Sequence, residues 1–392
     1  VNTLNLARIA NHELLNAFGQ NRDTDRISLA MYLVKKLMAI ADEDEDYGCL
    51  EDIVDYAMMD EDARLLDLFH EEGINFIEPY YGGRDGVSCL RDKCLECCRS
   101  ANVIKKFIDL GVNMERAVIA GRTPACILAD NQSCGAEVFR MFSVESMEQR
   151  DNTGRAAIHY AAAGGNADAL NIMLQKGVNA GLTQDAPAEA GNTPLHLACI
   201  YGKTDIARAL IEFGADDTAR NTNGETPAHY IVMENQHRSE LSTEERKELL
   251  SILPDIGIAR NDGKTPLMLL MTLEVPKVDK KELLPVLFEK GARINRTDNE
   301  GNTALLLCVQ TCRWSLELLK ALCKAGADLN AVDRDGNNVL YYVLKNGSEE
   351  AASYLLKKGA DYNRINRDGV SPAQVAVEKG YDTLLSLMPD IR

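Results

Sequence analysis

The sequence lacks the features that mark membrane proteins, nucleic-acid binders and most enzymes. Its 392 residues contain no apolar run near the ~20 residues that a membrane-spanning helix needs. The net charge of −17 argues against nucleic acid or an anionic membrane as the main partner, since both require a basic face. No G-x-S-x-G, H-E-x-x-H, phosphate-binding or dinucleotide-binding glycine motif is present. These absences favour a protein that is not an enzyme and needs no cofactor.

The cysteines do not form the pattern of a disulfide framework. There are 11 of them, an odd number, and several stand among apolar residues, as Cys126, Cys199 and Cys308 do. In a long chain this usage is typical of a reduced compartment, where Cys packs as a small hydrophobic side chain. We therefore expect a cytoplasmic protein. The chain begins at Val1 rather than Met, so the presence of residues and targeting signals upstream stays open.

Glycine pairs ten residues apart run through the chain, and the second glycine usually opens a motif. The clearest copy of the motif is GNTPLHLACIYG at 191–202. A fixed period of this kind indicates stacked units rather than one closed core. The pairs are Gly73 and Gly83, Gly111 and Gly121, Gly214 and Gly224, Gly291 and Gly301, Gly326 and Gly336, and Gly359 and Gly369.

One unit of the repeat predicts two helices and an extended finger. Thr193 and Pro194 start a short helix, with Pro in the first turn where its missing N–H costs nothing. Gly202 ends that helix, and apolar residues at helical spacing then predict a second helix that closes at Gly214. The ten polar residues that lead to the next motif glycine predict a finger with a turn at its tip.

The motif resembles the ankyrin repeat, whose 33-residue period and T-P-L-H-x-A signature it shares. The resemblance covers about residues 49–392 and implies about ten repeats. It implies an all-α repeat solenoid with a helix-turn-helix and a β-hairpin or loop per unit, curved around a concave groove. We expect an N-terminal helical cap or degenerate repeat at 1–48, degenerate repeats at 49–120, and the main array with a C-terminal capping repeat at 121–392.

Deviations from the period predict longer loops between the two helices of three successive repeats. From the motif Thr to the closing Gly, the interval is 21 residues in the clearest copy, but 31 from Thr226 to Gly257, 26 in the next repeat and 23 in the third. The excess is thus 10, 5 and 2. Either these loops form a binding edge, or they reflect neutral drift. The finger at 177–191 is predicted to be extended, and that at 257–263 to be stunted, with the groove more open beside it.

Two sets of residues are candidate metal ligands. Cys89, Cys94, Cys97 and Cys98 include a Cys-x-x-Cys spacing, but no second such pair follows, so they are weak zinc candidates. An enzyme or zinc-dependent activity of the N-terminal region is the alternative function. His159, His196 and His229 occupy equivalent motif positions, for which the ankyrin resemblance implies a packing and hydrogen-bonding role rather than a metal ladder.

The resemblance implies a non-enzymatic scaffold that binds one or more proteins through the concave surface, as a monomer, without nucleic acid or membrane insertion. The drifted repeats resemble ankyrin effectors that intracellular bacteria secrete, which would place the protein in the host cytoplasm; a eukaryotic adaptor fits almost as well. The acidic segment 42–72 is either a solvated flank or a docking site for a basic partner. The predicted partner-binding residues are Ile200, Tyr201, Glu225, Met233, Glu234, Lys264, Thr272, Leu273, Gln310 and Arg334.

Overall fold

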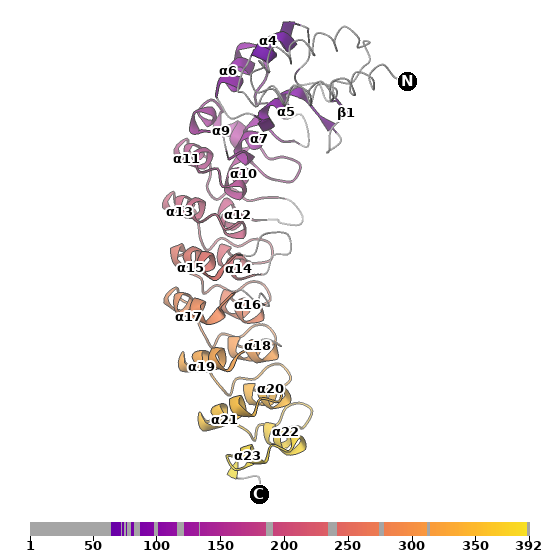
Figure 1. Ribbon diagram of the computed structural model, residues 1–392, viewed down its shortest axis with the longest axis vertical. Helices are drawn as coiled ribbons and strands as arrows, with labels where there is room; N and C mark the ends of the chain where they lie inside the picture. The colour runs from indigo at the N-terminus through magenta and orange to yellow at the C-terminus, as the bar shows by residue number, and fades with distance from the viewer. Residues whose placement is uncertain are drawn as a thin grey trace, which may run out of the picture. The chain divides into compact units, whose positions relative to one another are not determined.

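The structure is a computed structural model that divides into two compact units, each a series of helix pairs (Figure 1). Unit 1 holds residues 1–198 and 212–214, and unit 2 holds residues 199–211 and 215–392. The predicted N-terminal cap and most of the acidic segment lie outside the described residues. The structure describes residues 64–71, 73, 76, 80–81, 87–97, 101–115, 121–132, 134–185, 191–233, 241–273, 278–311 and 314–389.

Unit 1 includes the part of the chain for which degenerate repeats are predicted, followed by the first regular helix pairs. A short antiparallel hairpin, β1 (Tyr80–Tyr81) with β2 (Val87–Ser88), precedes its first described helix pair. Helix α12 (Pro194–Ile200) runs across the boundary into unit 2. The other described helices of unit 1 are α4 (Arg64–Glu71), α5 (Leu90–Cys97), α6 (Ala101–Asp109), α7 (Pro124–Asp130), α8 (Ala136–Phe139), α9 (Val144–Glu148), α10 (Ala157–Gly164) and α11 (Ala167–Gln175).

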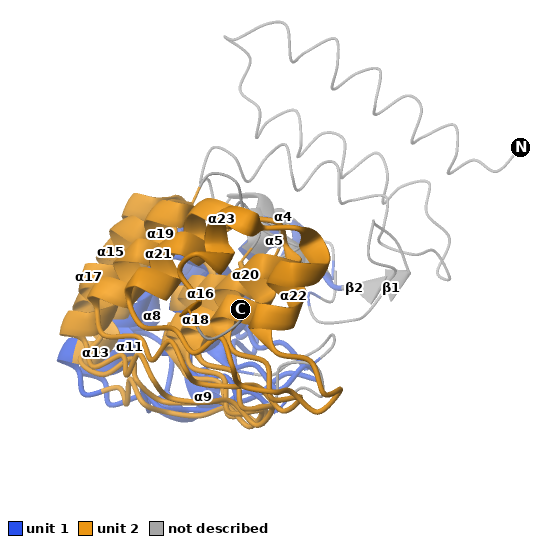
Figure 2. Cartoon of the chain, turned by 90° about the horizontal axis from the view of Figure 1, so that it is seen from below, with its two compact units in different colours: residues 1–198, 212–214 blue, residues 199–211, 215–392 orange. Residues whose placement is uncertain are grey.

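Unit 2 is a regular stack, in which the first helices of the pairs pack on one another in one column and the second helices in another (Figure 1). Seen along the stack, the loops that join the pairs gather on one side of both columns (Figure 2). No described helix in either unit has the length and apolarity needed to cross a membrane. The helices of unit 2 are α13 (Thr204–Glu212), α14 (Pro227–Val232), α15 (Thr243–Ile252), α16 (Pro266–Thr272), α17 (Lys280–Glu289), α18 (Ala304–Gln310), α19 (Leu316–Lys324), α20 (Val339–Lys345), α21 (Glu349–Lys357), α22 (Pro372–Lys379) and α23 (Asp382–Leu385).

The motif Thr starts the first helix of a pair by capping it. Thr265 and Thr303 accept the N–H of the third helical residue, and Asn338 and Ser371 do the same in the repeats that lack Thr. Such a cap satisfies one of the donors that a helix start leaves without an intrahelical partner, and contributes about 1 kcal/mol. The T-P motif thus fixes where each first helix begins.

The core lies between the columns. Helix α16 buries six of its seven residues, so it can exist only between neighbouring repeats. The second helices bury one face; α15, for example, buries Leu249 and Leu250 and exposes its acidic start. The predicted all-α stack is therefore confirmed. The fingers, predicted as hairpins or loops, are mostly loops that form tight turns, and the described residues contain only the β1–β2 hairpin as paired strands.

One closing glycine was assigned wrongly from the sequence. Helix α15 ends at Ile252, with Leu253 as its C-cap, and Gly257 lies in the finger beyond it. Leu253 avoids helical geometry because a proline follows it. Pro254 has no N–H to donate back to the helix, so α15 ends without a left-handed closing glycine. From Thr226 to Leu253 the interval is 27 residues, 6 above the standard 21, so the three excesses are 6, 5 and 2. The finger at 257–263 is not stunted.

A second departure concerns the repeat at 121–153. The residue 21 positions after its motif Thr123 is Val144 rather than a closing glycine, and Val144 opens α9, where Ser143 accepts the N–H of Ser146 at 3.1 Å. The chain thus makes an extra helical turn in place of an open finger. Helix α15 begins after the longer loop with a capping box, in which Ser242 and Glu245 each accept the backbone N–H of the other.

Stacking predicts that motif glycines and closing glycines respond differently to substitution. Gly263 and Gly326 have φ of +86° and +89°. A Cβ on Gly263 would lie 2.8 Å from the backbone N of Asn299, whereas a Cβ on Gly326 meets nothing within 4 Å. Urea unfolding should show a loss of about 1–2 kcal/mol for Gly326→Ala, from backbone strain alone. Gly263→Ala should cost about 2–5 kcal/mol, because overpacking is added. Equal losses would contradict the close approach of neighbouring turns.

Candidate functional site

The tips of the fingers in unit 2 share one hydrogen-bonded turn. In the turn at 221–225, the Asn221 N–H donates to the Glu225 carbonyl at 3.0 Å and the Gly224 N–H donates to the Asn221 carbonyl at 2.9 Å. The Asn221 side-chain oxygen accepts the N–H groups of Asn223 and Glu225 at 3.0 and 2.9 Å. The side chain thereby satisfies backbone donors that would otherwise be left to water. The same turn begins at Asp298, Asp333 and Asn366.

Each turn is also joined to the turn before it by one backbone hydrogen bond, which we name the turn ladder. In each case the second residue of a turn donates its N–H to the carbonyl of the third residue of the preceding turn. The four bonds run from Asn261 to Asn223 at 3.0 Å, from Asn299 to Asp262 at 3.0 Å, from Arg334 to Glu300 at 2.7 Å, and from Arg367 to Asp335 at 2.9 Å. The fingers of unit 2 are therefore held in fixed register.

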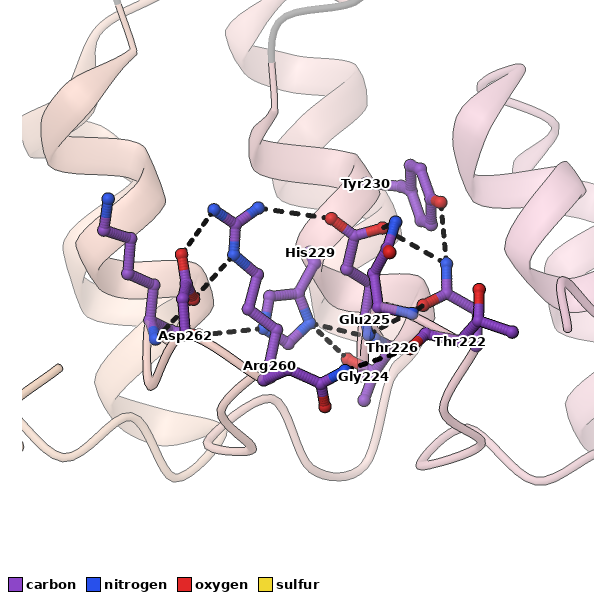
Figure 3. A network of polar contacts seen from close by, with 12 residues as sticks. Thr222, Gly224, Glu225, Thr226, His229, Tyr230, Arg260 and Asp262 are labelled. Carbon is purple, nitrogen blue, oxygen red and sulfur yellow. Dashed lines mark hydrogen bonds and ion pairs between the residues drawn. The ribbon is translucent and has the colours of Figure 1, made fainter. Parts of the chain in front are cut away.

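One turn has lost the Asp or Asn at its start and uses an ion pair instead (Figure 3). Arg260 stands at that position, and its guanidinium donates to both carboxylate oxygens of Asp262, at 2.8 and 2.7 Å. Asp262 in turn accepts the N–H of Lys264 at 3.0 Å. Arg260 also reaches Glu225 of the preceding repeat at 3.2 Å.

Sequence reasoning missed Arg260, although a signal was present. Asn221, Asp298, Asp333 and Asn366 all lie three residues before a motif glycine, and Arg260 occupies the same place before Gly263. A break in such a series marks a turn whose polar groups need another partner. The pairing with Glu225 depends on the stack itself and has no local signature.

Glu225 was predicted to bind a partner, but it is an internal anchor. It is only 5% exposed, and its carboxylate accepts hydrogen bonds from the amides of Asn221 and Asn223 besides the Arg260 contact. Burial alone would raise the pKa of Glu225; the hydrogen bonds from Asn221, Tyr230 and Asn223 and the charge of Arg260 outweigh it and lower that pKa. The carboxylate thus stays ionised with its partners inside the protein.

The motif histidines tie the helix start to the backbone. In His229, Nδ1 accepts the N–H of Thr226 at 2.9 Å, so the proton resides on Nε2, which donates to the Lys264 carbonyl at 3.2 Å. His159 is held in the same way, between the Ala156 N–H and the Leu182 carbonyl. Burial lowers the pKa of both rings to about 4, which keeps them neutral. With both nitrogens engaged, neither ring has a lone pair free for a metal.

The cysteine candidates are not arranged as a ligand set where the structure describes them. Cys89 and Cys94 are buried, and burial together with Asp92 raises the pKa of the Cys89 thiol to about 12. A thiol that stays protonated is a poor ligand and a poor nucleophile. The side chain of Cys97 and the whole of Cys98 lie outside the described residues, and the described part of the chain contains no group of three or more His, Cys, Asp or Glu placed to hold a metal ion.

Two further residues of the predicted partner surface are buried, and this corrects the prediction. Ile200, the last residue of α12, is 7% exposed, and Leu273, the C-cap of α16, is 4% exposed. With Glu225, they contribute to packing rather than to contact with a partner. Glu234 lies outside the described residues.

The remaining predicted residues lie at the surface of unit 2. Tyr201, Met233, Lys264 and Thr272 are half-buried, and Gln310 and Arg334 are exposed. Met233, Thr272 and Gln310 follow their motif glycines by the same nine residues, and Lys345 continues the series as an exposed side chain. The series changes from apolar to polar to basic along the stack.

Two inter-repeat ion pairs allow a matched test of the Arg260 network. Arg260 is 22% exposed and meets a nearly buried Glu225, whereas Arg334 and Glu300 are 67% and 59% exposed at a similar spacing. Arg260→Ala should lower the free energy of unfolding by about 2–4 kcal/mol, because it leaves a buried carboxylate unpaired. Arg334→Ala should change it by about 0–1 kcal/mol. Similar urea midpoints for the two variants would contradict an anchoring role of Arg260.

Relatives among well-described proteins match parts of the chain. It is 40% identical over 79 residues to human protein phosphatase 1 regulatory subunit 27, which takes in 20% of this chain and 49% of that protein. It is 31% identical over 143 residues to mouse Rabankyrin-5, which takes in 36% of this chain and 11% of that protein. The chain thus corresponds to at most about half the length of these relatives. The solved ankyrin repeat domain of Bcl-3 matches with a TM-score of 0.47 and 27% identity, over 57% of this chain and 94% of that one.

Family models match the regular part of the chain. The model for ankyrin repeats in three copies matches residues 242–333 and 312–391, and the model for ankyrin repeats in many copies matches residues 183–231. Together they span just over half of the sequence, over the same residues in which the helix pairs and the turn ladder are regular. The chain belongs to the ankyrin repeat family.

Proposed function

We propose that the chain is a non-enzymatic scaffold that binds a partner protein through one face of unit 2. This docking face consists of the half-buried or exposed residues Tyr201, Met233, Lys264, Thr272, Gln310, Arg334 and Lys345. It is preformed, because the first helices are fixed by packing and the fingers by the turn ladder. A preformed surface loses little conformational entropy on binding, so more of the contact energy remains as affinity.

The observation that carries the proposal is the common register of Met233, Thr272, Gln310 and Lys345. Equivalent positions in successive repeats form a line on the stack, and here that line is accessible to solvent. Its composition changes from Met to Lys, so the fitting partner presents an apolar side chain opposite Met233 and an acidic or polar one opposite Lys345. The apolar end supplies burial, and the basic end supplies orientation.

The relatives support a binding role at the level of the family. One is named as a regulatory subunit of a phosphatase, and a regulatory subunit acts by binding. From the relatives we extend only that role to this chain. We further propose that the protein is a monomer in the cytoplasm, which would be the cytoplasm of a host cell for a secreted bacterial effector. The graded loops between the helices of successive repeats lie largely outside the described residues, and their role stays a prediction.

Substitution of the apolar end of the docking face should abolish partner recovery. Tyr201→Ala combined with Met233→Glu removes apolar area and introduces a charge without replacing an N-cap residue or a residue of the turn ladder. In an affinity pull-down with quantitative mass spectrometry, the proteins enriched by the unmodified chain should fall by about tenfold or more.

The matched control introduces the same two residues, Ala and Glu, on the column formed by the second helices. Lys247→Ala with Ser251→Glu alters two exposed residues of α15. This variant should recover the same proteins as the unmodified chain, and circular dichroism should show both variants folded. Unchanged recovery with the Tyr201 and Met233 variant would rule out the docking face, and the absence of any enriched protein would rule out the scaffold.

A further inference from the structure

Two arginines of unit 1 lie beside one tyrosine ring. Arg122 and Arg155 each follow the motif glycine of their repeat, and the first helices of these two repeats, α7 and α10, pack against each other. The guanidinium carbon of Arg122 lies 4.7 Å from the ring centre of Tyr160, and that of Arg155 lies 6.0 Å from it. All three residues are half-buried, so a partner can reach this arginine–tyrosine cluster.

The buried carboxylate next to the cluster is occupied by its own repeat. One oxygen of Asp151 accepts the hydroxyl and the backbone N–H of Thr153 at 2.7 and 2.8 Å, and the backbone N–H of Arg155 at 3.0 Å. Its other oxygen accepts the hydroxyl of Tyr160. Asp151 thus holds the turn and the ring in place, and it forms no hydrogen bond with Arg122.

Arg122 itself has only one loose polar contact. Its Nη2 lies 3.7 Å from a carboxylate oxygen of Asp130, which is too long for a hydrogen bond, and Asp130 is exposed. Its Nε is buried and has no hydrogen-bond partner among the residues that the structure describes. An exposed ion pair of this length contributes little to stability. The guanidinium group therefore still has donors to offer to a stronger acceptor.

The equivalent cluster in unit 2 contains no charge at this position. Asn302 takes the place of Arg122, one residue after a motif glycine, and Tyr342 takes the place of Tyr160, six residues after the next motif glycine. The Gln310 amide donates to the Asn302 side-chain oxygen at 3.0 Å, and the Tyr342 hydroxyl donates to the first residue of its own turn, as that of Tyr160 does. The stack therefore forms without an arginine at this position.

We propose that the arginine–tyrosine cluster binds an acidic side chain of a partner protein. The partner's carboxylate accepts hydrogen bonds from the Nη groups of Arg122 in the forked geometry that arginine offers to carboxylates, and it displaces Asp130. Arg155 adds a second positive charge close by. Because the chain carries 60 acidic and 43 basic residues, an acidic segment is repelled by the protein as a whole, and the cluster determines where it binds.

This acidic-side-chain site is separate from the docking face. It lies in unit 1, and the docking face consists of residues of unit 2, with no residue in common. Failure of one proposal therefore leaves the other standing.

Titration of the full chain with an acidic peptide tests the site. The probe is an acetylated and amidated peptide of six glutamates. The readout is the ring NMR signal of Tyr160 in protein with carbon-13-labelled tyrosine, assigned as the signal that Tyr160→Phe removes. At low salt, where exposed charges are little screened, this signal should shift and saturate with a Kd on the order of 1 mM. The same peptide with glutamine in place of glutamate should leave the signal unmoved.

Two substitutions should change the affinity in opposite directions. Arg122→Gln removes the guanidinium group and should weaken binding of the glutamate peptide by about tenfold or more. Asp130→Asn removes the competing carboxylate and should strengthen binding by about threefold or more. An arginine that only packs against Tyr160 would give neither change.

The matched controls use the exposed pair of Arg140 and Glu137 in the same unit. Arg140→Gln and Glu137→Gln change the net charge by the same amounts as the two test variants, and each should leave the affinity within about twofold. An unmoved Tyr160 signal, equal binding of the glutamine peptide, or equal effects of the Arg122 and Arg140 variants would overturn the proposal. If Arg122→Gln does not fold, equal effects of Asp130→Asn and Glu137→Gln would overturn it.

Discussion

The backbone hydrogen bond between consecutive turns is the interaction on which the geometry of unit 2 depends. Polar fingers cannot bury an apolar face, and their backbone groups must find partners if the fingers are to keep one conformation. The turn ladder provides one such partner per repeat, and side-chain oxygens at the start of the turns provide two more. Because each bond joins neighbours only, the register of the fingers is set repeat by repeat.

The same constraint separates structural from available residues. The carboxylate of Glu225 is committed to the turns, because Asn221, Asn223 and Arg260 all bind it, and Glu225 is therefore buried in spite of its charge. Where the Asp or Asn is lost, Arg260 and Asp262 restore the same backbone contacts with different chemistry. Met233 and Lys345 lie outside the finger turns and are at least partly accessible, and they belong to the surface to which we assign partner binding.

Much of this fold could be predicted from the sequence because its signals are local. The T-P motif and the ten-residue glycine interval each act within a few residues, and the helix starts that the T-P motif predicts are confirmed. The closing position at Leu253 was missed because Pro254 changes the end of the helix, and Gly257 happened to lie nearby.

The partner surface was harder to predict than the fold. Whether Leu273 or Glu225 is exposed depends on what the adjacent repeat places against it, and a single repeat carries no such information. The partly buried pair between Arg260 and Glu225 joins residues 35 positions apart, which only stacking brings together. Repeat period and helix position could therefore be predicted residue by residue, whereas exposure could not.

Amide hydrogen exchange by NMR at Asn261, Asn299, Arg334 and Arg367 tests the turn ladder most directly. These four N–H groups lie in finger turns, where exchange would otherwise be fast, and each donates to the preceding turn. The account predicts that all four are protected by about 100-fold or more over an unstructured peptide. Exchange at the rate of an unstructured peptide, with the helices still protected, would show that the turns are not joined and would contradict the account.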